Sequence, residues 1–367
     1  MYYKNLDLSS DIIDTLIFGG GGTKGFVYLG LIKYLEEQKY IENIKYYYGV
    51  SAGSIICLLM NLGYNYKELV DILLNEVKYE DLVKIDSKSI LNIFDKFSIA
   101  DSTYLDNTLK ALIERKGFNP YINFKQLYDI TKKEFNVGFV KCFQNEFILA
   151  NYKTRPEMPV WLAVRASSGI PLVFQPVIDA INGFDFLIDG AIINDNVIGY
   201  YLTEKYVYST SDMTVLKYID KYTQTDENLN NDTQDNNTQD NNTQDNNTQD
   251  NNTQDNETQD TKIKSKKYHH NFICISLDVG SKDKLLFESI TELNKVKLQE
   301  YLMSVTRKVF YNQDSNQSIY EPYIFNIDCR NYNIGMANAK LSSEEYLKII
   351  SETYNATDKY FQSKLIK

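Results

Sequence analysis

Short apolar runs alternate with amphipathic stretches in the N-terminal part of the chain. Thr15–Phe18 is an apolar run that ends in glycines, and Lys45–Val50 is a tyrosine-rich run, so both predict strands. Ser54–Leu62 predicts a buried helix that Gly63 closes. Phe26–Gln38 predicts another helix, because apolar residues recur at helical spacing, namely Val27, Leu31, Tyr34 and Leu35.

The next part of the chain predicts helices and then a hairpin. Asn65 is expected to cap a helix, with Glu68 three residues later as its capping-box partner. Residues 86–136 are predicted to be mostly helical. Val137–Phe143 and Glu146–Tyr152 are separated by a short polar pair, which predicts two antiparallel strands joined by a tight turn.

The alternation continues to the C-terminus. The expected elements are a strand over Phe184–Ile188, a partly helical stretch over Gly199–Tyr208, a buried strand over Phe272–Leu277, a long helix over Lys284–Tyr311, a strand over Tyr323–Ile327 and a terminal helix over Ser342–Lys364. Glu345 follows Ser342 by three residues, which is a second capping box. Strands separated by helices predict an α/β fold with a mostly parallel central sheet and helices on both faces.

Residues 223–267 interrupt this pattern with a low-complexity tract. A Thr-Gln-Asp-Asn-Asn unit recurs there, and its threonines stand five residues apart from Thr233 to Thr258. The tract has too few apolar residues to offset the conformational entropy lost when a backbone becomes ordered, and we therefore expect it to be disordered. It is expected to be an insertion within one domain formed by residues 1–222 and 268–367. Asn- and Gln-rich tracts can bind partners or self-associate, while a neutral expansion in a tolerant loop is the simpler interpretation.

Charge is distributed unevenly along the chain. Hydrophobic residues make up 43% of the 367 residues, which is ample for a core, and the formal net charge is −10. Ten acidic residues and no Lys or Arg lie between Asp226 and Asp260, so the remainder has 49 − 10 = 39 acidic residues against 39 basic ones. The expected folded part is therefore neutral and lacks the basic footprint of a nucleic-acid-binding protein.

Several features bear on the cellular compartment. The four cysteines are scattered without a C-x-x-C pair, which favours reduced thiols of a cytosolic protein. Residues 1–14 have no long apolar region, so we expect no signal peptide. No apolar stretch approaches the ~20 residues that span a bilayer. We therefore expect a cytoplasmic protein whose membrane contact is peripheral.

The segment Gly49-Val50-Ser51-Ala52-Gly53 joins the second predicted strand to a helix. A tight strand-to-helix turn lifts a serine Oγ out of the sheet, and flanking glycines remove side chains that would clash. The N-terminus of the following helix lowers the cost of an alkoxide. The pattern therefore predicts a nucleophile elbow, although a turn with only a structural role can have the same sequence pattern.

A glycine run follows the first predicted strand. The backbone N–H groups of Gly20, Gly21 and Gly22 can point into a cleft and bind an oxyanion, helped by the positive end of the next helix. Lys24 is expected to support this loop, to meet an anionic headgroup or to be solvated.

Nucleotide binding is the competing interpretation of the same run. The spacing of a P-loop is absent, because Lys24 is followed by glycine rather than Ser or Thr. Gly20–Gly25 does satisfy G-x-G-x-x-G, and Glu42 is a candidate for the acidic residue of a dinucleotide site. The elbow two elements later favours an oxyanion hole.

The chain offers two kinds of catalytic base. The only histidines, His269 and His270, flank the low-complexity tract, where a base is poorly held, although a Ser-Asp-His order is formally available. Asp189 directly follows a predicted strand and precedes Gly190, so it lies at a strand end, where site residues gather. A Ser-Asp dyad is therefore favoured; the alternative for Asp189 is a turn aspartate that bonds its own backbone.

Taken together, these segments resemble the patatin-like phospholipases. Four blocks carry the resemblance in the same order: Gly20–Gly25, Gly49–Gly53, Arg165–Pro171 with Phe174 and Pro176, and Asp189–Ala191. It spans roughly Leu16 to Asn196. It departs from the family at Gly19, where some members have Asp, and at Asp195-Asn196, where an Asn-Pro-like pair is more usual; the insertion is also foreign to it.

The resemblance implies a three-layer α/β/α fold with Ser51 as nucleophile and Asp189 as its base. It implies an oxyanion hole and supporting motif residues, the former from Gly20, Gly21 and Gly22 and the latter from Lys24, Gly25, Gly49, Gly53, Gly190 and Ala191. It implies no metal and no cofactor.

The expected activity is that of a lipid acyl hydrolase of the phospholipase A type. Its partners would be a phospholipid or another acyl-ester lipid and a membrane contacted peripherally, but no nucleic acid. An unidentified protein activator is a further candidate partner. A general carboxylesterase or thioesterase uses the same chemistry. An idle member of the fold that binds partners is a third alternative.

Overall fold

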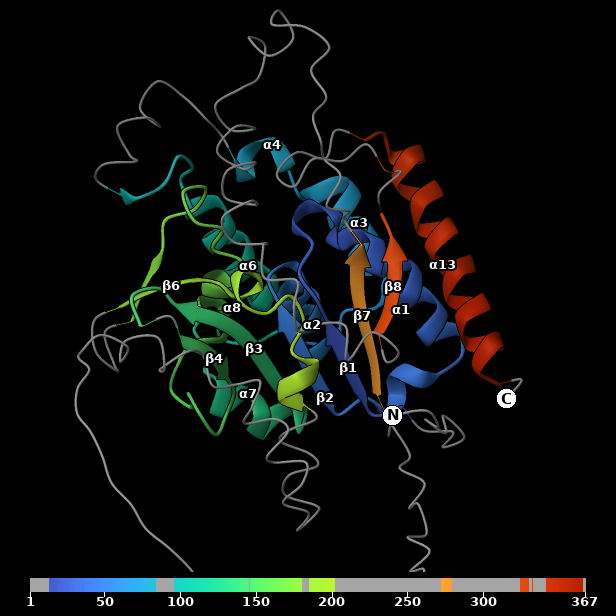
Figure 1. Cartoon of the computed structure of the whole chain (residues 1–367), viewed down its shortest axis with the longest axis horizontal. Helices are drawn as coiled ribbons and strands as arrows, with labels where there is room; N and C mark the ends of the chain where they lie inside the picture. The colour runs from blue at the N-terminus through green and yellow to red at the C-terminus, as the bar shows by residue number, and fades with distance from the viewer. Residues whose placement is uncertain are drawn as a thin grey trace, which may run out of the picture.

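A mixed, mostly parallel sheet organises the molecule (Figure 1). A computed structural model describes residues 13–83, 96–144, 146–179, 185–201, 272–278, 324–329, 332 and 341–365. The strands are β1 (Thr15–Phe18), β2 (Tyr46–Val50), β3 (Glu134–Lys141), β4 (Glu146–Ala150), β5 (Val177–Asp179), β6 (Asp185–Asp189), β7 (Phe272–Asp278) and β8 (Ile324–Asp328). Their order is β5-β6-β3-β2-β1-β7-β8, and β4 pairs with β3 outside this path.

The parallel and antiparallel parts of the sheet meet at β3. β2 pairs parallel with β1 and β3, and β1, β7 and β8 pair parallel with one another in turn. β3 instead pairs antiparallel with both β4 and β6, and β5 with β6. Because Val50 is aligned with Gly138 and Phe139 with Asp189, β6 ends beside the end of β2.

The α-helices connect and cover these strands. They are α1 (Tyr28–Glu37), α2 (Ala52–Asn61), α3 (Tyr66–Asp71), α4 (Tyr79–Leu82), α6 (Thr103–Arg115), α7 (Phe124–Thr131), α8 (Val160–Ser167) and α13 (Ser343–Leu365). The predicted capping box of Asn65 and Glu68 is confirmed, and the side chains of Ser342 and Glu345 form the reciprocal bonds expected of them. Within the described residues, no helix is both long and apolar enough to cross a membrane.

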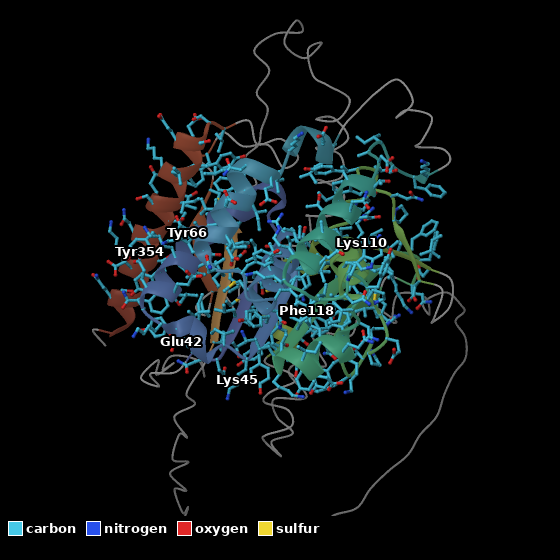
Figure 2. The ribbon with its side chains drawn as sticks, turned by 180° about the vertical axis from the view of Figure 1, so that it is seen from behind. Glu42, Lys45, Tyr66, Lys110, Phe118 and Tyr354 are labelled. Carbon is cyan, nitrogen blue, oxygen red and sulfur yellow. The ribbon has the colours of Figure 1, made fainter. Side chains whose placement is uncertain are left out.

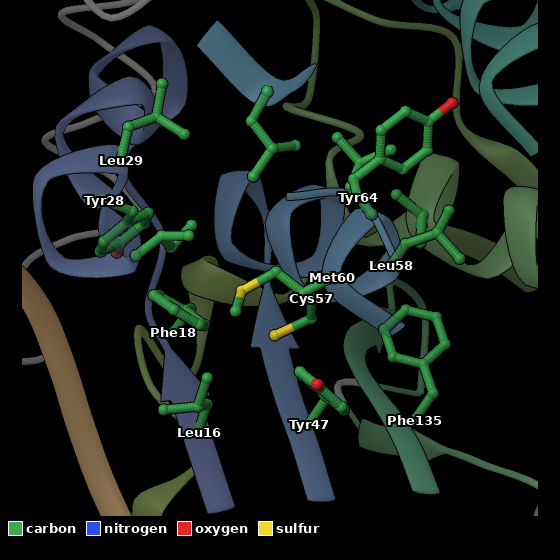
Figure 3. Close-up of a cluster of buried hydrophobic side chains, with 14 of the residues drawn as sticks. Leu16, Phe18, Tyr28, Leu29, Tyr47, Cys57, Leu58, Met60, Tyr64 and Phe135 are labelled. Atoms are coloured by element: carbon green, nitrogen blue, oxygen red, sulfur yellow. The ribbon is translucent and has the colours of Figure 1, made fainter. Parts of the chain in front are cut away.

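The two faces of the sheet carry different cores. Leu16 and Phe18 belong to the larger core on one face, together with Tyr28 of α1 and Cys57 of α2 (Figure 3). The opposite face of β1 contributes Ile17 to a smaller core, and the described helical segment on that face is the short stretch 198–201. The predicted α/β fold around a mostly parallel sheet is therefore confirmed.

The C-terminal helix α13 lies along α1, so helices from the N-terminal and C-terminal parts of the chain share one layer (Figure 1). A Cβ on Gly30 of α1 would lie 2.0 Å from Thr353 Oγ1 and 2.5 Å from the Ile350 carbonyl oxygen. Glycine at this position therefore lets the two helices approach closely. Tyr354 of α13 donates a hydrogen bond to Glu37 and lies on the outer side of this pair (Figure 2).

Some boundaries differ from the sequence prediction. The helix expected from Phe26 begins as a 3-10 turn over Gly22–Val27, and α1 follows from Tyr28. The stretch 86–136 contains α6 and α7, as the expectation of mostly helical structure requires, but its last residues are a strand, because β3 begins at Glu134 and is buried along its whole length. The antiparallel pairing of β3 with β4 confirms the predicted hairpin.

Other predictions lie outside the described residues. They concern the insertion over 223–267, the helix over Lys284–Tyr311, and His269 and His270.

Candidate active site

Ser51 sits on a strained turn between β2 and α2. Its φ is 51° and its ψ is −126°, a combination that non-glycine residues rarely adopt. A Cβ on Gly49 would lie 2.5 Å from Ser54 Cα, and one on Gly53 would lie 2.3 Å from the Phe18 carbonyl oxygen. Both flanking glycines are therefore required by the close passage of neighbouring backbone, as expected for a nucleophile elbow.

Asp189 lies within hydrogen-bond reach of the serine. Ser51 Oγ donates to Asp189 Oδ2 over 2.7 Å. The other carboxylate oxygen, Oδ1, accepts from the Ala191 N–H over 2.9 Å. A Cβ on Gly190 would lie 2.4 Å from the Gly138 carbonyl oxygen, so glycine lets the turn after β6 press against β3. The structure thus joins two residues that stand far apart in the sequence.

Burial controls the basicity of Asp189, whose exposed fraction is 4%. Burial raises the pKa of its carboxyl to about 7, while the hydrogen bonds from Ser51 and Ala191 lower it and the charge of Asp195 raises it. A carboxylate with a pKa near neutrality is a much better base for a serine proton than an ordinary aspartate.

A serine cluster holds the elbow in place. The Ser51 N–H donates to Ser167 Oγ over 2.9 Å, and Ser167 Oγ donates to the Gly138 carbonyl oxygen over 2.6 Å. The Ser51 carbonyl oxygen accepts from Ser54 Oγ over 2.6 Å and from Ser168 Oγ over 3.3 Å. The sequence drew attention to Ser167 and Ser168 only through the fourth block of the resemblance, and gave no sign that they contact the elbow.

The glycine loop lies beside Ser51, but its three expected donors are not equivalent. The Gly20 N–H already donates to the Asp195 carbonyl oxygen over 2.9 Å. The N–H groups of Gly21 and Gly22 have no acceptor among the residues that the structure describes. A Cβ on Gly20 would lie 3.6 Å from Ser51 Cβ, which places the loop next to the hydroxyl.

Lys24 and Gly25 follow the loop into the interior. Lys24 is 3% exposed, so the expectation of a solvated lysine is wrong; the 3-10 turn over Gly22–Val27 carries its side chain inward. A Cβ on Gly25 would lie 2.9 Å from Ala52 Cβ. Gly25 therefore lets the loop pack against the residue that follows the candidate nucleophile.

Arg165, which begins the block Arg165–Pro171, is buried and connects several elements. Its guanidinium lies over the Phe174 ring, and its Nε is 2.9 Å from Asp106 Oδ1. Its Nη2 donates to the Gln175 carbonyl oxygen over 2.6 Å and also to Ser102. The arginine thereby ties α8, which carries Ser167, to α6 and to the loop before β5.

The geometry disfavours the dinucleotide interpretation. Glu42 precedes β2 and lies near Lys45, at the edge of the sheet where β2 begins (Figure 2). The glycine loop follows the end of the parallel strand β1, which is the opposite edge. In a dinucleotide fold the acidic residue and the glycine loop act at the same, carboxyl edge of the sheet.

Other donor sets in the described part of the chain are sparse. Among those residues, no group of three His, Cys, Asp or Glu side chains could hold a metal ion. The hydrogen bond from Ser51 to Asp189 is direct, and both histidines lie outside the described residues.

Comparisons with known proteins give matches in both sequence and fold. The sequence profile of a family described as "Patatin-like phospholipase" matches residues 16–201, about half of the chain. A relative named "Probable lipid hydrolase 463L" from Invertebrate iridescent virus 6 is 29% identical over 49% of this chain and 60% of its own length. "Triacylglycerol lipase ptl3" from Schizosaccharomyces pombe is 30% identical over 44% of this chain and 33% of its own length. The chain thus spans less than two thirds of the length of these curated relatives.

Among solved structures, that of VipD from Legionella pneumophila is similar in fold, with a TM-score of 0.50 and 13% identity. The similarity covers 96% of this chain and 67% of that protein.

Proposed function

The chain belongs to the patatin-like phospholipase family, and from this premise we propose that it is a lipid acyl hydrolase of the phospholipase A type. The observation that carries the proposal is the 2.7 Å hydrogen bond from Ser51 Oγ to Asp189 Oδ2 at a strained strand-to-helix turn. A nucleophile held by a base at such a turn is the arrangement that acyl transfer requires.

The proposed reaction has two steps. Asp189 accepts the Ser51 proton as Oγ attacks the ester carbonyl carbon, and the tetrahedral intermediate collapses with cleavage of the ester C–O bond. The alcohol or lysolipid leaves with the proton from Asp189, and an acyl-serine remains. Water then attacks this acyl group and gives its proton to Asp189. Collapse releases the fatty acid, and Ser51 Oγ regains the proton.

The glycine loop supplies the proposed oxyanion hole. Gly21 and Gly22 are the better donors, because the Gly20 N–H is already engaged by Asp195 in this structure. The N-terminus of α2, which begins directly after Ser51, adds a favourable dipole. Removal of one oxyanion donor typically costs about 3–4 kcal/mol of barrier.

Peripheral contact with a lipid surface is the second part of the proposal. Phe97 and Phe143 both pack against Phe186, with ring centroids 5.4 and 5.5 Å away, and Ile178 is the cross-strand neighbour of Phe186. Phe143 is 76% exposed, Ile178 60% and Phe97 51%. We call these four residues the aromatic cluster. Neighbouring apolar groups left in water are typical of interaction surfaces.

The position of the aromatic cluster favours a lipid interface as its partner. Phe186 lies on β6, three residues and therefore about 10 Å of strand before Asp189. Phe143 follows β3 beyond the point where β2 ends at the elbow. The cluster thus lies at the same end of the sheet as the ester-cleaving pair, where a lipid that leaves its bilayer would arrive. Aromatic rings are favoured at such interfaces.

Fatty-acid release from mixed phospholipid vesicles tests the proposed activity. Wild type, Ser51→Ala, Asp189→Asn and a His269→Ala/His270→Ala double variant would be compared. Activity lost in the first two variants and kept in the third supports the dyad. Loss in a folded histidine variant would replace the dyad with a triad.

The choice of substrate in the same assay separates the related chemistries. A triacylglycerol emulsion is included because two similar proteins are named triacylglycerol lipases. Release from short soluble esters alone would indicate a general carboxylesterase or thioesterase. No reaction of Ser51 with any ester or with a fluorophosphonate would indicate an idle member of the fold.

A further inference from the structure

A second carboxylate lies against the glycine loop. Asp195 Oδ1 is 2.8 Å from the position that a Cβ on Gly20 would take, and Ser276 Oγ donates to Oδ2 over 3.2 Å. The Asp195 carbonyl oxygen also accepts the Gly20 N–H. Gly20 is the loop residue that lies beside Ser51. Asp195 is therefore held by two hydrogen bonds, one to its side chain and one to its main chain, at the edge of the candidate site, and the proposed reaction does not use it.

The carboxylates of Asp189 and Asp195 repel each other, and no ion pair within the described residues offsets this repulsion. Burial raises the pKa of Asp195, and the charge of Asp195 in turn raises the pKa of Asp189. The other titratable groups that face Asp195 are Tyr28 on α1 and Cys274 on β7, and burial raises the pKa of both, so they are neutral near pH 7. Among the described residues, no lysine or arginine forms an ion pair with either carboxylate.

We propose that Asp195 is a positioning residue for the pair of Ser51 and Asp189: its main chain fixes the Gly20 peptide beside the nucleophile, and its negative charge makes Asp189 a stronger base. This inference rests on the proposed function, because it assumes that Ser51 attacks and that Asp189 takes the proton.

Two consequences distinguish this role from simple structural support. Without the neighbouring charge, Asp189 should deprotonate at a lower pH, because a like charge disfavours the ionised form. The same change weakens Asp189 as a base, so the rate at high pH should fall as well. A residue that only stabilised the fold would lower the rate without moving the pH at which it is half-maximal.

The test is the pH dependence of Ser51 labelling by a fluorophosphonate in the full-length protein. Ser51 Oγ attacks phosphorus, fluoride leaves and Asp189 takes the proton, so the rate reports the pair without any lipid. The main variant is Asp195→Asn, which keeps the shape and the main-chain bond. Asp195→Ser serves as a second neutral variant if the first folds poorly. Glu114→Gln, on the exposed face of α6, is the matched loss of one charge, and Ser51→Ala is the labelling blank.

We expect the midpoint of the acid limb to fall by about one pH unit in both neutral variants. The labelling rate at the alkaline plateau should fall about threefold. Glu114→Gln should match the wild type. An unchanged or raised midpoint in a folded Asp195 variant would overturn the inference. Labelling that behaves as expected without hydrolysis of any lipid would support the role of Asp195 and refute the lipase activity; no labelling of wild-type Ser51 would overturn both.

Discussion

Single residues at the candidate site are held in states that cost stability. Ser51 occupies an unfavourable backbone conformation, and Asp189 is a carboxyl buried beside another acid. Such strain persists only where the surrounding structure holds the residue in place. Here the hydrogen bonds between Ser51 and the hydroxyls of Ser54, Ser167 and Ser168 hold the turn. In the proposed function, this strained turn and this buried carboxyl are the features that would make the serine and its base reactive.

The buried carboxyl of Asp189 gives the first prediction. Its pKa is about 7 in the folded protein and about 4 in the unfolded chain, so the folded state binds more protons between these values. The contribution of Asp189 to the free energy of unfolding therefore falls as pH rises from about 4 to 7 and then levels off, by on the order of 4 kcal/mol. Asp189→Asn removes this contribution.

Urea unfolding of wild type and Asp189→Asn at pH 5 and pH 8 would measure the effect. The variant should gain stability relative to wild type at the higher pH, and other titrating groups cancel in the comparison. If the free energies of unfolding of the two proteins differed by the same amount at both pH values, the raised pKa of Asp189 would be contradicted.

Ser167 gives a second prediction at this scale. Ser167→Ala leaves the Ser51 N–H and the Gly138 carbonyl oxygen without their buried partner, which should cost about 2 kcal/mol of stability. Because the elbow loosens, kcat should fall more than about tenfold with little change in KM. Ser168→Ala, which removes only a 3.3 Å bond to the same turn, is the matched control. Equal effects of the two variants in steady-state kinetics would argue against this role of Ser167.

At the scale of elements, close approach of backbones sets the geometry. The turn after β6 reaches β3 because residue 190 is glycine, and α2 crosses the end of β1 because residue 53 is glycine. The same principle joins α1 to α13 at Gly30. These contacts bring the strand ends together, and the site forms where they meet.

The helix crossing at Gly30 can be tested separately from the site. Gly30→Ala would place a methyl group within 2.5 Å of the Ile350 carbonyl oxygen and 2.6 Å of the Tyr354 nitrogen, both main-chain atoms. The helices must separate, which should cost about 1–3 kcal/mol despite the better helix propensity of alanine. Asn355→Ala on the exposed face of α13 is the control and should be neutral or slightly stabilising. The melting temperatures of the two variants would be measured by thermal unfolding. A Gly30 variant as stable as wild type would mean that the helices are not in close contact.

For the molecule as a whole, the fold includes more of the chain than the family match does. The match ends at residue 201, yet β7 pairs with β1 and α13 packs on α1. The sheet is therefore completed by chain segments from both sides of the low-complexity tract. From this pairing we propose a single domain formed by residues 1–222 and 268–367, with 223–267 as an insertion.

Shortening the tract tests this organisation. Deletion of residues 233–252, which are four exact copies of the five-residue unit, should leave the unfolding temperature and vesicle hydrolysis unchanged, because the removed residues have no apolar side chains to bury. Vesicle activity and melting temperature would be measured side by side. Loss of activity in a protein that still melts like the wild type would assign the repeats a functional role instead.

The aromatic cluster gives a prediction about how the whole molecule meets its substrate. Phe143→Ser should lower activity on zwitterionic vesicles roughly tenfold, since one buried phenyl ring is worth about 1.5–3 kcal/mol. Activity on a short soluble ester should stay unchanged. Ile130→Ser is a matched loss of an exposed apolar side chain on α7, which precedes β3 and so lies at the other end of the sheet. A Phe143 variant that loses both activities, or neither, would exclude the cluster as the lipid contact.

The sequence by itself determined most of the elements and the candidates for the chemistry. Periodicity located β1, β2, the β3–β4 hairpin and α13 to within a few residues, because their apolar patterns are local consequences of burial on a strand or helix face. It located the elbow because the glycines around Ser51 are a local requirement of a tight turn. It missed the start of β3, whose polar residues Glu134 and Asn136 are buried only by neighbouring strands.

Only the tertiary structure decided what lies beside what. The bond between Ser51 and Asp189, the engagement of the Gly20 amide, the burial of Lys24 and the contact of Asp195 with the glycine loop all join segments that are distant in sequence. No local pattern encodes such contacts, because each depends on which strands become neighbours and in which register. The pKa of a buried carboxyl follows from the same packing. The chain thus specifies the candidate reactive groups locally, and their arrangement arises from the fold.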